Sequence, residues 1–106
     1  IPFCYIGQEE WIKAPLNYEK LDNFYKNSNS DSFILKIKGT KHMDYADMPH
    51  FSNLGRKIVS GKNVDKEFTN RISNSILGFF DNYLKNNTYN WTEDIVLNYD
   101  TSIQFK

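Results

Sequence analysis

A short apolar segment that leads into a glycine turn and a histidine is the feature that most restricts the fold of this chain. Residues 33–38 have the length and the residue types of a buried strand. Gly39 follows this segment directly, and His42 comes three residues later. In an open α/β sheet, ligands bind outside the carboxyl ends of the strands. A histidine at this point is therefore a candidate for chemistry.

The first part of the chain predicts a strand, a helix and a second strand. Residues 1–6 form an apolar run that ends at Gly7 and is typical of a strand buried on both faces. Asn17 offers a side-chain cap to a helix over about residues 17–28. The strand at 33–38 then returns beside the first one, so we expect a parallel pair joined by a helical crossover.

The second part predicts a long amphipathic helix and a terminal hairpin. Asp65 can cap a helix over about residues 65–85, whose apolar side chains recur every three or four positions and form one stripe. The stripe consists of Phe68, Ile72, Ile76, Phe79, Phe80, Tyr83 and Leu84. In the tail, residues 95–105 have strand-like composition with a turn at Asp100, which predicts a terminal β-hairpin. The expected fold class is α/β.

Composition restricts the partners that this chain can have. Its 106 residues suit one compact domain, and 13 basic side chains balance 13 acidic ones. This balance provides no electrostatic basis for binding a nucleic-acid backbone or an anionic membrane surface. Cys4 is the one cysteine, so neither an intrachain disulfide nor a cysteine-based zinc site is available. No apolar stretch approaches the roughly 20 residues of a membrane span.

Three segments together resemble the last third of an α/β-hydrolase. They are Tyr5–Glu10 at the end of the first strand, Leu35–His42 with its Gly-Thr-x-His sequence, and Tyr45–Asp47. The nearest resemblance is to the branch that contains platelet-activating-factor acetylhydrolases and dienelactone hydrolases. It covers about residues 1–85 and implies a βαβ-α C-terminal portion of the hydrolase fold. We therefore divide the chain into a hydrolase segment, 1–87, and a C-terminal extension, 88–106.

By this resemblance, His42 is the general base of a serine hydrolase that cleaves small carboxylic or acetyl esters, without a cofactor. Thr40, Met43 and Tyr45 would line the substrate pocket. The family places its serine on a Gly-x-Ser-x-Gly elbow, and no serine of this chain stands in such a sequence. The nucleophile is therefore expected upstream of Ile1, in the remainder of the hydrolase domain. We expect the chain alone to be inactive, because a base without its nucleophile cannot transfer an acyl group.

The acidic member of the triad has two placements. In many α/β-hydrolases it follows the strand before the histidine in a Gly-x-x-Asp pattern, and the segment from Gly7 to Glu10 would make Glu10 this acid. In the acetylhydrolase branch the acid lies one strand earlier, which is outside this chain. We favour the second placement, and Glu10 is the candidate within the chain.

Two further interpretations compete with the hydrolase. His42, Asp44, Asp47 and His50 provide two imidazoles and two carboxylates within nine positions, a ligand set that suits zinc or another divalent metal. Alternatively, the chain is a non-catalytic module that associates with itself or with a partner, because its strand edges and its long amphipathic helix need further surface to cover them.

Overall fold

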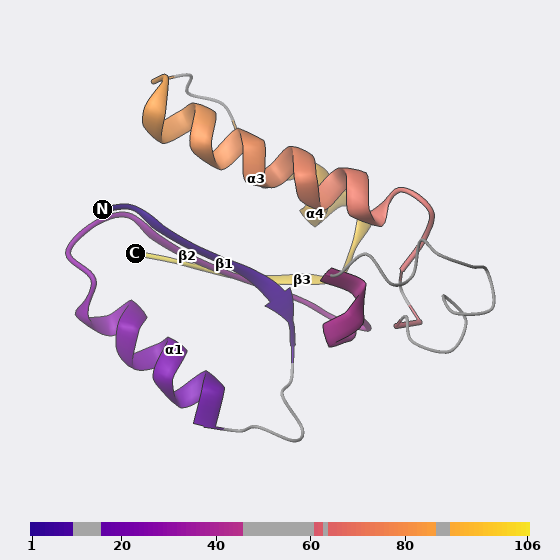
Figure 1. Ribbon diagram of the computed structural model, residues 1–106, viewed down its shortest axis with the longest axis horizontal. Helices are drawn as coiled ribbons and strands as arrows, with labels where there is room; N and C mark the ends of the chain where they lie inside the picture. The colour runs from indigo at the N-terminus through magenta and orange to yellow at the C-terminus, as the bar shows by residue number, and fades with distance from the viewer. Residues whose placement is uncertain (10–15, 46–60, 63, 87–89) are drawn as a thin grey trace.

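A computed structural model describes residues 1–9, 16–45, 61–62, 64–86 and 90–106 (Figure 1). In chain order the elements are β1 (Phe3–Gln8), α1 (Leu16–Asn27), β2 (Ser32–Ile37), the 3-10 helix η1 (His42–Tyr45), α3 (Phe68–Leu84), α4 (Glu93–Asn98) and β3 (Thr101–Phe105). The α/β class is confirmed. The predicted parallel strands and the helices at 17–28 and 65–85 are present, with bounds that differ by one to three residues.

The strands form one mixed sheet in the order β1-β2-β3. β1 pairs with β2 in parallel, from Phe3 opposite Ser32 to Gln8 opposite Ile37. β3 pairs with β2 in the antiparallel direction. β2 is the central strand, and the side chains of Ile34, Leu35 and Ile37 are almost completely buried.

Helices lie on both faces of the sheet (Figure 1). On one face, α1 places the Tyr18 ring under the Lys36 ammonium, 4.4 Å from the ring centroid, and none of its described residues is buried. On the other face, α3 and α4 cover the buried side chains of the sheet. This second layer contains the core, which consists of Ile37, Phe68, Ile72, Ile95 and Tyr99, with Ile6, Tyr45 and Val64 packed against it.

An aromatic cluster closes the other end of this layer. The Phe33 ring on β2 lies 5.1 Å from Trp91 and 4.6 Å from Phe105, centroid to centroid. Phe79 of α3 packs against the same ring at 6.3 Å. Aromatic pairs at these separations stabilise the fold by more than the apolar area that they bury. Trp91 and Phe105, which follow residue 87 in the sequence, therefore pack in the same layer as Phe33 and Phe79, which precede it.

The predicted terminal hairpin is wrong. Residues 93–98 form helix α4, and only residues 101–105 of this region form a strand, which pairs with β2 instead of with its own neighbour. Ile95 is the buried residue of α4, and Trp91 before the helix and Tyr99 at its C-cap are buried as well. Glu93 and Asp94 stand in the first turn, where acidic side chains stabilise a helix.

Candidate functional site

His42 lies beyond the carboxyl end of β2, at the start of η1 (Figure 1, magenta). The connection from Ile37 includes Gly39, whose φ of 72° is in the left-handed region that glycine adopts without a steric cost. The His42 side chain is exposed. The structure thus has an accessible imidazole at the edge of the sheet where parallel strands end, which is where open α/β sheets bind ligands.

A hydrogen-bond chain fixes the turn that carries this histidine. Thr40 Oγ1 donates to the carbonyl oxygen of Ile37 at 2.8 Å and lies 3.0 Å from Tyr45 Oη. Because the threonine hydroxyl has one proton, Tyr45 Oη donates to Thr40 Oγ1. The Tyr45 ring packs edge-on against Phe68 at 5.5 Å, and burial raises the pKa of its hydroxyl. Tyr45 therefore stays protonated and keeps this hydrogen bond.

The buried carboxylate of Asp44 stabilises the same turn. Its residue is 4% exposed, and Oδ2 accepts the backbone N–H groups of Lys41 at 2.6 Å and Gly61 at 2.9 Å. The Asp44 backbone N–H in turn donates to the Lys41 carbonyl oxygen at 3.0 Å. Among the described residues, Asp44 Oδ1 is buried without a hydrogen-bond partner. One carboxylate thus joins the histidine turn to a distant segment.

Gly61 and Gly39 bring these two segments into direct contact. A Cβ atom on Gly61 would lie 1.9 Å from the carbonyl oxygen of Gly39 and 2.7 Å from the Cα of Thr40. Backbone atoms cannot move aside as a side-chain tip can, so this approach requires glycine. Neither this contact nor the role of Asp44 could be read from the sequence, in which the two glycines were the only sign of a close approach.

The remaining site candidates are only partly described. Glu10, Asp47 and His50 lie outside the described residues, as does the side chain of Met43. Within the described part of the chain, no group of three or more His, Cys, Asp or Glu side chains could hold a metal ion. Thr40 and Tyr45, the other two predicted pocket residues, are hydrogen-bonded to each other beside the His42 turn.

The strand register places the carboxyl ends of β1 and β2 at the same edge of the sheet. Gln8, the last residue of β1, stands opposite Ile37, the last residue of β2. Tyr18 of α1 donates its hydroxyl to the carbonyl oxygen of Gln8 and so holds the end of β1. The chain therefore leaves both parallel strands at one edge of the sheet.

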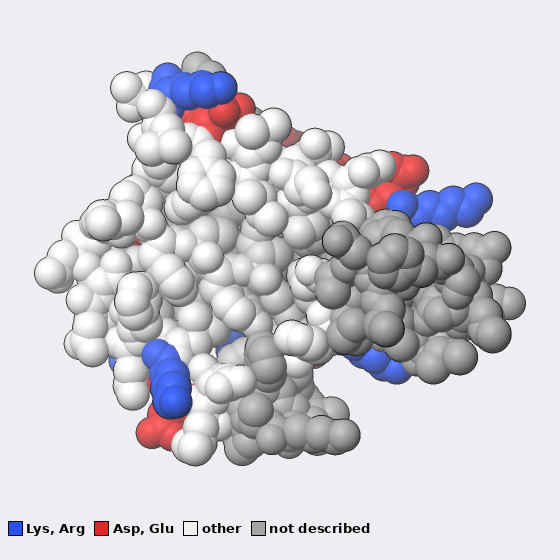
Figure 2. All heavy atoms as spheres, in the orientation of Figure 1, with Lys and Arg blue, Asp and Glu red and all other residues white. Residues whose placement is uncertain are grey.

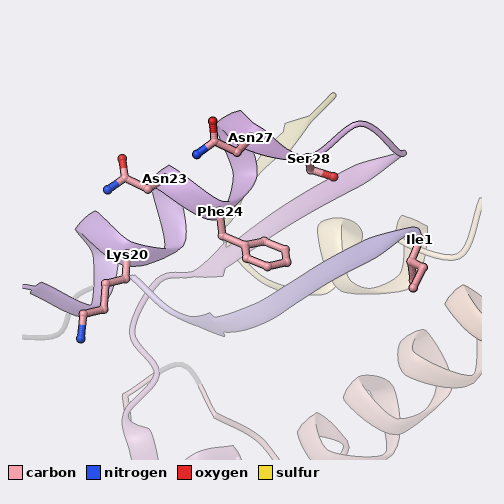
Figure 3. Close-up of a pocket in the computed structure, with 6 residues that line it drawn as sticks. All are labelled: Ile1, Lys20, Asn23, Phe24, Asn27 and Ser28. Atoms are coloured by element: carbon pink, nitrogen blue, oxygen red, sulfur yellow. The ribbon is translucent and has the colours of Figure 1, made fainter.

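A separate groove lies between α1 and the beginning of the chain (Figure 3). Its volume is about 390 Å³, and its walls are Ile1, Lys20, Asn23, Phe24, Asn27 and Ser28. The Phe24 ring points from α1 toward the sheet in Figure 3 and packs against Phe3, 4.7 Å away. His42 is not part of these walls, so the groove is distinct from the histidine site.

Most of the charged side chains visible in Figure 2 lie near the margins, and several basic ones stand next to acidic ones. The middle of this face is uncharged. Exposed apolar side chains occur on α3, notably Leu77, Phe80 and Leu84, which are 57%, 50% and 75% exposed. Of the helices that the structure describes, none has the length and apolarity to cross a membrane.

Comparisons of the chain with protein-family models, with curated proteins and with solved structures gave no match.

Proposed function

We propose that this chain is the C-terminal segment of a serine hydrolase with the α/β-hydrolase fold, and that His42 is its triad histidine. One observation carries the proposal: an exposed His42 lies three residues after the positive-φ Gly39, at the carboxyl end of the central, buried strand β2. A catalytic imidazole needs this combination of a rigid support and access to substrate.

In this mechanism, neutral His42 accepts the proton of a serine hydroxyl while the serine oxygen attacks the carbonyl carbon of an ester. The resulting imidazolium then donates that proton to the leaving alcohol, and water releases the acyl group by the same two steps. The serine belongs to polypeptide outside residues 1–106. Residues 1–106 by themselves therefore have no esterase activity.

The sheet topology favours one side of the sheet for the upstream strands of the proposed hydrolase. β3 occupies the side of β2 that faces away from β1, so among the described strands β1 has an open outer side next to the parallel pair. The upstream part of a hydrolase would continue the parallel sheet from β1. In this arrangement the nucleophile approaches His42 from the β1 side, and β3 is on the opposite side.

The test begins with the coding sequence ahead of Ile1, where a Gly-x-Ser-x-Gly elbow is expected. The longer polypeptide should hydrolyse p-nitrophenyl acetate, and His42→Gln should lower kcat by roughly 10³-fold or more at unchanged fold. His50→Gln is the matched control, because His50 is the second of the two histidines and should be dispensable. Full activity of His42→Gln, or loss of activity in both variants, would contradict the proposal.

Glu10→Gln distinguishes the two placements of the acid. If Glu10 orients the histidine, the amide should lower kcat strongly with little effect on KM, because the imidazolium formed in the transition state loses its counter-charge. If the acid lies one strand earlier, turnover should remain unchanged. We expect the second result.

A further inference from the structure

The outer edge of β3 has backbone groups that point away from the sheet. Ser32 and Lys106 exchange backbone hydrogen bonds at 3.0 and 2.9 Å, and the Lys38 N–H donates to the Asp100 carbonyl oxygen at 2.8 Å. In an antiparallel pair, alternate residues make these bonds. The even-numbered residues of this segment therefore face β2, and the N–H and C=O groups of Thr101, Ile103 and Phe105 face outward.

This edge lacks the features that protect an exposed strand. Natural edge strands usually carry charges, proline or a bulge that prevents another strand from pairing. From Thr101 to Phe105 the sequence Thr-Ser-Ile-Gln-Phe has none of these charges and no proline. Ile103 and Phe105 are 40% and 61% exposed. The edge can therefore accept a further strand.

We propose that a second copy of this chain pairs with this edge through its own β3, in the antiparallel direction, about a two-fold axis at Ile103. Ile103 then stands opposite Ile103 of the partner subunit, and Thr101 stands opposite Phe105 of the partner subunit. These are the residues whose backbone groups point outward, so each pair forms the hydrogen bonds of an antiparallel ladder. The interface is isologous and gives a continuous six-stranded sheet from two three-stranded sheets.

Charge complementarity identifies a second copy as the occupant and also sets the register. With Ile103 on the axis, Asp100 stands opposite Lys106 of the partner subunit, and the symmetry repeats this pair at the other end. Opposite charges directly across a ladder stabilise the pairing. A register shifted by two residues would keep the backbone hydrogen bonds but place Asp100 opposite Gln104 of the partner subunit, without a counter-charge.

Both charged side chains lie on one face of the sheet. Lys106 Nζ donates to the carbonyl oxygen of Tyr25 in α1 at 3.2 Å, and even-numbered residues of the strand share that face. Asp100 lies 3.8 Å from Lys38, with its side chain 70% exposed. These contacts are exposed, so both groups can also reach a partner subunit. On the opposite face, Phe105 stacks on Phe33 and would continue the apolar surface across the axis.

Cysteine cross-linking tests the register in residues 1–106. The background is Cys4→Ala, which removes a half-buried thiol whose pKa burial raises to about 12. Ile103→Cys should form an intermolecular disulfide readily, because directly opposed Cα atoms are about 5.5 Å apart. Thr101→Cys is the matched control on the same face of the strand, and its copies would be roughly 13 Å apart. Equal cross-linking of the two variants, or none with Ile103→Cys, would overturn the proposal.

Charge reversal tests the partner in solution. Light scattering should show a dimer, and Asp100→Lys alone or Lys106→Asp alone should raise the dimer dissociation constant about tenfold, because like charges then face each other at both ends. The double variant should restore dimerisation. Asp22→Lys in α1 controls for net charge, and circular dichroism controls for folding. A monomeric wild-type chain, or a dimer that none of these reversals weakens, would refute the pairing; the hydrolase proposal does not depend on either outcome.

Discussion

Asp44 Oδ2 accepts the backbone N–H of Gly61 at 2.9 Å, across 17 positions of sequence. The same oxygen accepts the backbone N–H of Lys41, one residue before His42. The orientation of the candidate catalytic turn therefore depends on a carboxylate that is itself too buried to contact a substrate.

The loss of this carboxylate should destabilise the protein. Asp44→Ala leaves two part-buried backbone donors without their acceptor, which should lower the free energy of unfolding by about 3 kcal/mol. Asp44→Asn retains an amide oxygen as acceptor and should lose less. Urea denaturation measures both, with the exposed Glu19→Ala as a control that should change stability by less than about 0.5 kcal/mol. An Asp44→Ala protein as stable as the control would contradict this role.

The contact between Gly61 and Gly39 predicts an unequal response to two alanine substitutions. In Gly61→Ala the new methyl group meets backbone atoms at 1.9 and 2.7 Å, and the cost should be about 3 kcal/mol. In Gly7→Ala it meets the Tyr5 hydroxyl end at 2.3 Å, which can rotate away, and the cost should be about 1 kcal/mol. Thermal unfolding of both variants provides the comparison. If Gly7→Ala were the more destabilising of the two variants, the backbone of Gly39 and Thr40 would adapt more easily than the Tyr5 ring.

Two phenylalanines on opposite faces of the sheet should differ in their contribution to stability. Phe33 lies within 6.3 Å of the rings of Phe79, Tyr83, Trp91 and Phe105, so Phe33→Ala should cost about 3 to 5 kcal/mol. Phe24 is 58% exposed and packs on Phe3, so Phe24→Ala should cost less than about 1 kcal/mol. Chemical denaturation distinguishes them, and similar losses would show that α1 is as firmly packed as α3.

Stability should decrease at alkaline pH. Burial raises the pKa of Cys4 from 9.0 to about 12, and burial together with the Asp31 hydrogen bond raises the pKa of Tyr83 from 10.0 to about 12. Above pH 9 the unfolded chain therefore loses protons that the folded protein retains, which favours unfolding. The loss should begin near pH 9 and continue to about pH 12. Cys4→Ala should remove the part that begins near pH 9, and an unchanged pH profile in this variant would assign that part to other groups.

The sequence was most informative where residues interact with near neighbours along the chain. Two apolar runs and the stripe that includes Phe68 and Ile72 predicted β1, β2 and α3, because each pattern reflects one buried face. Helix α4 was missed because Ile95 and Val96 favour strands. The pairing of β3 with β2 was not predictable from either segment, because it joins residues more than 60 positions apart.

The candidate site also has one part that local sequence predicts and one part that depends on distant residues. The location of His42 after a strand and a glycine could be read from local sequence. The contacts that hold its turn could not, because Asp44 and Gly61 meet only when a distant segment returns to the same place. From its residue type, Asp44 was a candidate metal ligand. Its burial and its hydrogen bonds to the backbone of Lys41 and Gly61 depend on the tertiary structure, so the sequence did not reveal them.

The central place of β2 has a consequence for synthesis on the ribosome. β1 emerges before β2 and can pair with it early, whereas β3 ends at Phe105 and emerges much later. During this interval one side of an apolar strand stays without its neighbour, a state that promotes aggregation of nascent chains. Chaperones that bind nascent chains should therefore raise the yield of soluble protein more than a later supply of refolding factors.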